Sequence, residues 1–307
     1  MRKMPVIKFF WFFADLAKIR IGLLVTFSMV AGSILAQRAL SGRVFLPALG
    51  IFFLASGGCA LNQFQERMID GLMERTRRRP IPSGRMRPSV ALASAVVMIL
   101  LGFMFFLCST SSTSLLLGVF ALSWYNGVYT SLKRRTALAS IPGALVGMFP
   151  PAIGWVSGGG SLSDPGLWVL ALFFFLWQVP HFWLLGLQYA DDYEKVEYPS
   201  LRRSFNPNQI RNIISIWLLA TGCLCFCMPL FLLIRLLPVH LLLIATTLWL
   251  YWGTFSAFRA KSREASFKAV FRRINLYAFW VLFLLSADTL LNSDLIRAGG
   301  MLAMGWR

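Results

Sequence analysis

The chain carries little charge, and acidic side chains are especially scarce. Charged residues make up 14% of its 307 residues, and 30 Lys and Arg stand against only 12 Asp and Glu. An ordinary soluble domain carries about 25% charged residues, so this composition excludes that class. Hydrophobic residues make up 57% of the chain and the mean hydropathy is +0.66. We therefore expect a single polytopic membrane domain over residues 1–307.

Ligands for a soft metal are also few, since the chain has 5 Cys and only 2 His. Every cysteine falls in an apolar segment, and the run CLCFC at 223–227 has no further ligand nearby in the sequence. A structural zinc site takes about four such ligands. The cysteines are therefore expected to serve packing.

Long apolar segments predict an all-α membrane protein with nine transmembrane helices. Each segment is close to the ~20 residues that a bilayer crossing requires. The expected spans are residues 19–37, 44–63, 90–108, 113–131, 139–157, 166–187, 213–234, 238–257 and 274–292.

The basic residues indicate how these spans are oriented. With nine spans and a cytoplasmic N-terminus, 25 of the 30 Lys and Arg fall on the cytoplasmic side. This asymmetry follows the positive-inside rule, so the C-terminus is expected on the opposite side of the cytoplasmic (inner) membrane. Topology then accounts for most of the +18 net charge, and the aromatic–basic interleaving of a nucleic-acid surface is absent. We expect membrane lipid, and no nucleic acid, as a partner.

The polar stretch 62–87, after the second expected span, carries the most informative chemistry. Asn62, Glu66 and Asp70 are spaced i, i+4, i+8, so a helix would place them on roughly one face. Ionisable groups at a membrane helix end are functional candidates by default. Carboxyl and amide oxygens suit Mg²⁺, and the stretch also holds seven arginines, which suit phosphate. It predicts a magnesium diphosphate site; the alternative is that the acids only pair with neighbouring arginines.

A second acidic cluster follows the sixth expected span, where Asp191 and Asp192 open a loop. The two clusters are four spans apart and both face the cytoplasm. This spacing suggests two four-helix halves plus one further helix, around a central cavity open to the cytoplasmic face. The alternative for the Asp pair is an ordinary helix-end loop.

The segment YTSLKRRT at 129–136 ends the fourth expected span with three basic residues. Lys133 is the one we expect to reach diphosphate oxygens, as a point donor of charge. The alternative is that these residues only anchor the helix end to anionic lipid.

Four segments also carry a family resemblance. They are MERTRRRPIPSGR (73–85), YTSLKRRT (129–136), PGALVGMFPPAIGW (142–155) and LWQVPHFWLLGLQYADDY (176–193). They resemble the UbiA superfamily of intramembrane prenyltransferases, and within it most of all the protoheme IX farnesyltransferase, or haem O synthase, family. The chain departs from the family pattern at Glu66, where the family has Asp, and at Ala190, where it usually has Lys.

The resemblance implies transfer of a farnesyl group from farnesyl diphosphate to a vinyl group of haem b. Loss of diphosphate gives an allylic cation, the vinyl group attacks it, and water completes haem O. Arg75, Arg79 and Lys133 would hold phosphate oxygens. A downstream haem-modifying enzyme is a further candidate partner. The implied Mg²⁺ ligands, which are also the implied catalytic residues together with Lys133, are Asn62, Glu66, Asp70, Asp191 and Asp192.

His181 lies just after Pro180 in the sixth expected span, and the resemblance suggests a role in haem binding. On a helix it falls near one face with Gln188 and Asp192, which makes a polar stripe toward the acidic cluster. The alternative is a histidine that satisfies carbonyls freed by the Pro180 kink.

Two other functions remain open at this stage. A related enzyme would prenylate the aromatic ring of a quinone precursor, although the PHFW and DDY elements favour haem. A multi-span transporter with a charged cytoplasmic gate would place polar groups near the bilayer midplane. Here the acids gather at one membrane face, which argues against transport.

Overall fold

A computed structural model describes residues 6–109, 112–231, 233–259 and 263–304. Within those ranges the regular structure is helical, and nine helical segments are long and apolar enough to cross a membrane, as predicted. The spans are built from α2 (Ile19–Gln37), α3 (Phe45–Gln65), α5 (Pro88–Cys108), α6 (Ser112–Ser123) with η2 (Trp124–Tyr129) and α7 (Thr130–Leu132), α8 (Ser140–Gly143) with η4 (Ala144–Met148) and α9 (Phe149–Ser157), α10 (Pro165–Gln188), α13 (Pro207–Cys227), α14 (Leu237–Arg259) and α15 (Arg263–Met304). The shorter elements are α1 (Val6–Ala17), η1 (Gly42–Val44), α4 (Arg67–Asp70), η3 (Ala137–Ala139), α11 (Ala190–Lys195), α12 (Leu201–Ser204) and η5 (Met228–Phe231).

Helix α13 begins at Pro207, well before the predicted start at residue 213. The cause is a capping box that the hydropathy pattern does not contain. The Asn206 side chain accepts from the backbone N–H of Gln209 at 3.0 Å, and the Gln209 side chain accepts from the N–H of Asn206 at 2.9 Å. Pro207 at the first helical position has a backbone angle already suited to a helix. The polar start of this helix therefore extends beyond the apolar run.

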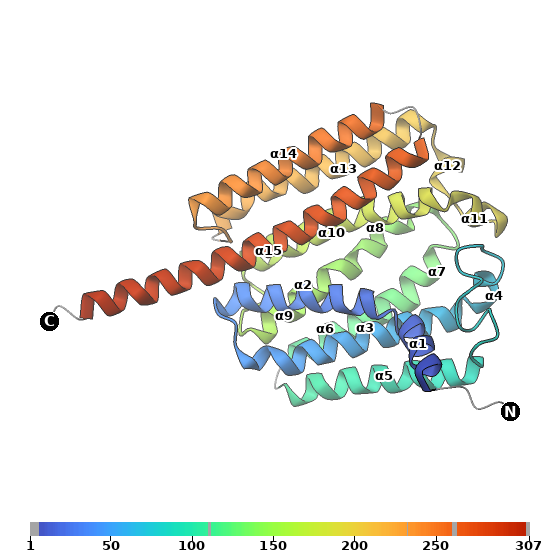
Figure 1. Cartoon of the computed structure of the whole chain (residues 1–307), viewed down its shortest axis with the longest axis horizontal. Coiled ribbons are helices and arrows are strands. Elements are labelled where there is room, and N and C mark those ends of the chain that lie inside the picture. The colour runs from blue at the N-terminus through green and yellow to red at the C-terminus, as the bar shows by residue number, and fades with distance from the viewer. Residues whose placement is uncertain (1–5, 110–111, 232, 260–262, 305–307) are drawn as a thin grey trace.

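The spans form two groups that meet where α2 and α6 pack against α9. Helices α3, α5 and α6 belong to the first half of the chain, whereas α9, α10, α13 and α14 belong to the second (Figure 1). Helix α2 packs against α3 in the first half, against α9 in the second and also against α15. This arrangement agrees with the prediction of two four-helix halves and one additional helix.

The contact between α2 and α9 depends on glycine. A Cβ atom on Gly154 would overlap the carbonyl oxygen of Met29, and one on Gly32 would overlap that of Pro151. In a membrane, small residues allow helix backbones to approach closely, and the resulting packing replaces the hydrophobic effect that holds soluble helices together. The two halves are therefore joined at a glycine-lined crossing.

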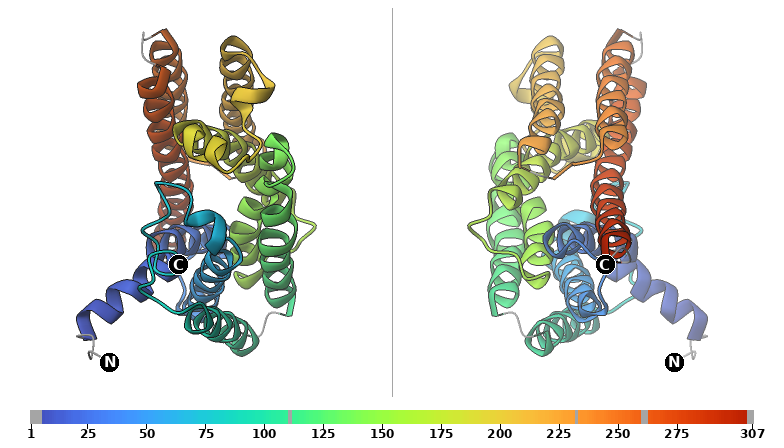
Figure 2. Two further views of the ribbon diagram at one scale, coloured as in Figure 1. Left: turned by 90° about the vertical axis from the view of Figure 1, so that its right-hand side faces the viewer. Right: turned by 90° about the vertical axis from the view of Figure 1, so that its left-hand side faces the viewer.

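Four of the short helices gather at one end of the bundle. Helices α1, α4, α11 and α12 lie at that end, whereas the C-terminal part of α15 extends past the other (Figure 1). The end-on views show α4 and its loop beside the α10–α11 region (Figure 2). Both acidic clusters therefore occupy the same end of the molecule.

Candidate active site

The first acidic cluster lies where α3 ends. The helix stops at Gln65, and Glu66 leads into the short helix α4. The i+4 hydrogen bonds nevertheless continue, because the N–H of Glu66 bonds the Asn62 carbonyl at 3.0 Å and the N–H of Asp70 bonds the Glu66 carbonyl at 2.8 Å. All three side chains are buried, with 3%, 7% and 3% of Asn62, Glu66 and Asp70 exposed. The predicted cluster is thus present as three buried side chains, spaced i, i+4 and i+8, whose oxygen atoms can bind a metal ion.

Each carboxylate of this cluster has a cationic partner from elsewhere in the chain. Arg79 donates to Asp70 Oδ2 at 2.6 Å, and Lys133 Nζ lies 2.6 Å from Glu66 Oε2. The hydroxyl of Tyr198 also donates to Glu66, at 3.4 Å. Burial raises the pKa of Asp70 while the Arg79 charge opposes that rise, and burial lowers the pKa of Lys133 while Glu66 opposes that fall. Two predicted phosphate binders, Arg79 and Lys133, therefore lie directly at the acids.

Asp192 joins the second cluster to the first. Its two carboxylate oxygens accept the backbone N–H groups of Glu74 and Arg75, at 3.0 and 2.9 Å. Burial would raise the pKa of Asp192, but those two N–H groups and the nearby Lys195 ammonium lower it overall. The carboxylate therefore fixes the loop that carries Arg75 and Arg79 against α11. The sequence placed the two clusters at one membrane face, and the structure brings them into contact.

Asp191 lies apart from that contact. Its side chain is 85% exposed and pairs with Arg202 at 2.7 Å. The backbone N–H of the predicted binder Arg75 bonds Asp192 at 2.9 Å, and its guanidinium lies over the ring of Tyr189, 4.8 Å from the ring centre. The loop thus places the Arg79 side chain at Asp70 and the Arg75 side chain over Tyr189.

His181 faces α15 rather than the acidic cluster. Its Nδ1 lies 2.9 Å from Asn275 Oδ1, and its ring packs against Trp177 and Phe271, with centroids 4.8 and 5.0 Å away. The predicted polar stripe from His181 to Asp192 is not continuous, because α10 ends at Gln188 and Asp192 lies on the separate helix α11.

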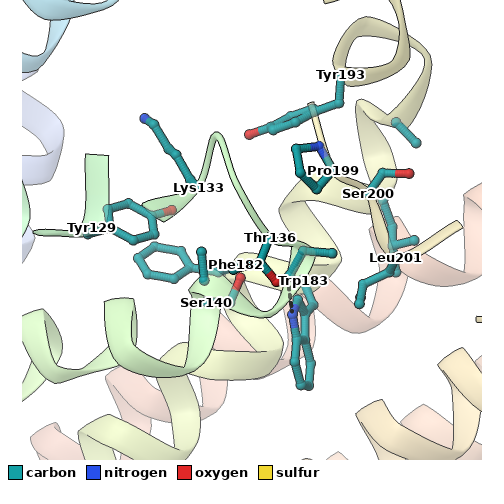
Figure 3. Close-up of a pocket in the computed structure, with 15 residues that line it drawn as sticks. Tyr129, Lys133, Thr136, Ser140, Phe182, Trp183, Tyr193, Pro199, Ser200 and Leu201 are labelled. Carbon is teal, nitrogen blue, oxygen red and sulfur yellow. Dashed lines mark hydrogen bonds between the residues drawn. The ribbon is translucent and has the colours of Figure 1, made fainter. Parts of the chain in front are cut away.

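A cavity of about 60 Å³ lies beside Lys133. Figure 3 shows Lys133 and Tyr129 on one side of it and Tyr193 and Pro199 on the other. The rings of Tyr129 and Phe182 stack at its wall, with centroids 5.1 Å apart. The sequence did not identify these aromatic residues, which the structure places in the cavity wall beside Lys133.

The sequence reading also missed Lys18, which links α1 to α2. Its backbone is left-handed, with φ 47° and ψ 54°, a conformation that costs a non-glycine residue free energy and is concentrated at functional sites. Burial, together with the neighbouring charges of Arg79 and Lys133, lowers the pKa of Lys18 to about 8. The only sequence signal is a lysine between two apolar helices.

The donor set fits a hard cation. Among the described residues, no group of three or more His, Cys, Asp and Glu side chains is placed to hold a metal ion. The candidate set instead combines the Asn62 amide with the Glu66 and Asp70 carboxylates. Oxygen donors of this kind suit Mg²⁺, which binds through one or two carboxylates plus substrate phosphates.

Comparison with known proteins identifies the family of this chain. A protoheme IX farnesyltransferase of Geobacter sulfurreducens is 46% identical over 59% of this chain and 66% of its own. One of Nitratidesulfovibrio vulgaris Hildenborough is 32% identical over 81% of this chain and 86% of its own. The fold is similar to a UbiA homologue of Archaeoglobus fulgidus bound to DMAPP and Mg²⁺, with TM-score 0.70 and 14% identity over 91% of this chain and 98% of that one. The UbiA prenyltransferase family model matches residues 24–284, and the chain belongs to the UbiA prenyltransferase family.

Proposed function

We propose that this protein transfers a farnesyl group from farnesyl diphosphate to a vinyl group of haem b, giving haem O. The observation that supports the proposal is a pair of ion pairs at one end of the bundle. Glu66 pairs with Lys133, and Asp70 pairs with Arg79. The names of the similar Geobacter and Nitratidesulfovibrio proteins support the choice of substrates.

The proposed metal is Mg²⁺, held by Asn62, Glu66 and Asp70, with Asp191 and Asp192 as the carboxylates of the opposite half. The metal would neutralise charge that grows on the leaving diphosphate. The Archaeoglobus homologue, described as bound to DMAPP and Mg²⁺, supports this assignment. Asp191 would have to release Arg202 to take part, which costs little because an exposed ion pair contributes only about 0–1 kcal/mol.

The protein side chains would stabilise the charges that develop on the leaving phosphate and on the allylic cation. Arg75, Arg79 and Lys133 supply fixed positive charge to the departing phosphate oxygens, which is most effective where water is excluded. The stacked rings of Tyr129 and Phe182 lie beside Lys133, where an aromatic face stabilises an allylic cation by about 0.5–2 kcal/mol. The vinyl group then forms the new C–C bond, and water adds to the resulting cation with loss of a proton.

His181 is the proposed contact to haem. The Asn275 side-chain N–H₂ donates to the Phe271 carbonyl, which turns the amide oxygen of Asn275 toward His181. The Nδ1 of His181 must then carry the proton, which leaves a lone pair on Nε2. A neutral imidazole in this tautomer is suited to bind haem iron or to accept a hydrogen bond.

We expect His181→Ala to weaken haem binding about tenfold or more while changing farnesyl diphosphate binding by less than about twofold, because the imidazole lies on α10, away from the acids. Titration of both substrates in purified protein measures this, with His240→Ala as the control. Equal losses for the two substrates, accompanied by a lower melting temperature, would identify His181 as a packing residue only.

We further propose that the whole chain acts as one domain of the inner membrane, with its N-terminus cytoplasmic and its C-terminus on the other side. The positive-inside distribution supports this orientation. Reporter fusions after Arg87 and after Arg307 are expected to report opposite sides; the same side for both would refute the orientation.

A haem-modifying enzyme that consumes the product is proposed as a downstream partner, to be tested by co-purification.

The direct test of the reaction incubates purified protein with haem b, farnesyl diphosphate and Mg²⁺ and analyses the extracted pigment by mass. We expect a product with the mass of haem b plus one farnesyl group and one hydroxyl group. A parallel incubation replaces haem b by a quinone-precursor aromatic acid. Prenylation of that ring, with haem b unchanged, would overturn the proposal in favour of the quinone branch.

A further inference from the structure

The amide of Asn62 is held by a residue that the reaction itself does not require. Its Nδ2 donates to the hydroxyl of Thr130 at 3.1 Å, across 68 residues of sequence. Both side chains are buried, with 3% of Asn62 and 4% of Thr130 exposed. A buried amide with one fixed partner has a defined orientation, which matters if its oxygen is to face a ligand.

The hydrogen-bond roles in this contact follow from a count of protons. The Thr130 hydroxyl has one hydrogen, and it donates that hydrogen to the Tyr125 carbonyl at 2.9 Å. A carbonyl can only accept, so the hydroxyl must act as an acceptor toward Asn62. The group of Asn62 that faces Thr130 is therefore the N–H₂, and Oδ1 points away from Thr130. Within the described residues no hydrogen bond engages that Oδ1.

Thr130 owes its position to the π-helical segment η2. The backbone N–H of Thr130 bonds the carbonyl of Tyr125, five residues earlier, which is the wider turn of a π-helix. Such single-turn segments are frequent at functional sites because they redirect the side chains beside them. Because of the wider turn, the hydroxyl and the N–H of Thr130 both donate to the carbonyl of Tyr125. The hydroxyl then faces α3.

A second set of hydrogen bonds holds η2 against α3. The side-chain N–H₂ of Asn126 donates to the Gly58 carbonyl at 3.0 Å and to Gln65 Oε1 at 3.2 Å. The Gln65 side chain returns a bond to the Asn126 carbonyl at 3.1 Å. Contacts at residues 58 and 65 thus join α3 to η2, and the contact at Asn62 joins it to Thr130 at the start of α7, so the Thr130 hydroxyl is fixed relative to Asn62.

We infer that Thr130 is a positioning residue that orients the Asn62 amide oxygen toward the magnesium diphosphate. The inference rests on the proposed function, in which Asn62 is a metal ligand. Residues that orient metal ligands are typically worth about 10–100-fold in metal affinity. Thr130 holds the ligand in place and does not touch the metal.

The test replaces Thr130 by Val, which has nearly the same shape but no hydroxyl. The readout is the Mg²⁺ concentration that gives half-maximal thermal stabilisation of the purified protein, in the presence of the slowly reacting analogue farnesyl thiodiphosphate. Thr130→Val is expected to raise this concentration about tenfold or more, and Thr130→Ser, which keeps the hydroxyl, by less than about threefold. Thr221→Val is the matched control, because Thr221 is also buried and its hydroxyl, within the described part of the chain, bonds only the Trp217 carbonyl in α13.

An unchanged Mg²⁺ requirement in Thr130→Val overturns the inference, and so does an equal shift in Thr221→Val. A melting temperature that falls without ligand while the Mg²⁺ requirement stays constant also overturns it, since Thr130 would then serve folding alone. If Mg²⁺ and the analogue fail to stabilise even the unmodified protein, the proposed metal site itself is wrong. The first three results leave that proposed site intact.

Discussion

Asp70→Ala is expected to lower turnover about a thousandfold or more while the protein remains folded in the membrane. Asp70 is buried, follows Glu66 in the i+4 series and is bonded to Arg79 at 2.6 Å. Its removal takes away a proposed metal oxygen and the anchor of a proposed phosphate-binding arginine. Losing several kcal/mol of transition-state stabilisation corresponds to about three orders of magnitude in rate. Single-turnover formation of haem O at saturating Mg²⁺ measures the effect.

Two further variants are compared with Asp70→Ala in this experiment. Glu74→Gln alters a side chain on the same loop that is 67% exposed and, among the described residues, pairs only with Arg77, so turnover is expected to stay within about twofold. Asp192→Ala frees the backbone N–H groups of Glu74 and Arg75, which should release the loop and lower turnover about a hundredfold. Activity near normal in Asp70→Ala or Asp192→Ala would contradict a site shared by the two clusters.

The membrane architecture was largely predictable, because hydropathy acts over whole segments. An apolar run of about 20 residues crosses a bilayer whatever its neighbours are, and all nine predicted spans are present in the described residues. The start of α13 was not predictable from hydropathy, since it depends on hydrogen bonds between Asn206 and Gln209. The residues of that capping box are present in the sequence NPNQ at 206–209, outside the apolar run that defines the predicted span.

The candidate site was predictable only in its local part. The spacing of Asn62, Glu66 and Asp70 identifies a common face because one helical segment sets it. Which cation meets which acid depends instead on tertiary packing: Lys133 reaches Glu66 across 67 residues of sequence. The neighbours Asp191 and Asp192 look alike in the sequence, yet one side chain is exposed and the other binds a loop. No periodicity in one chain distinguishes them.

The pair formed by Lys133 and Glu66 leads to the second large expected effect. Lys133→Met is expected to lower turnover about a hundredfold to a thousandfold, because it removes a cation from the departing diphosphate. It also leaves the Glu66 carboxylate buried without its partner 2.6 Å away. Removing one member of a buried pair typically costs about 3–5 kcal/mol, so the melting temperature should fall as well. Turnover must therefore be measured well below that temperature.

Stability and function at Lys133 are separated by two further measurements. The double variant Glu66→Gln/Lys133→Met should recover most of the lost stability, because no uncompensated carboxylate remains. Affinity for farnesyl thiodiphosphate should stay low in Lys133→Met and return largely in Lys133→Arg, since arginine keeps the charge. Full affinity for the analogue in Lys133→Met would mean that the lysine only neutralises Glu66. The diphosphate would then have to be held without Lys133 by Arg75 and Arg79, the other two proposed phosphate-binding residues.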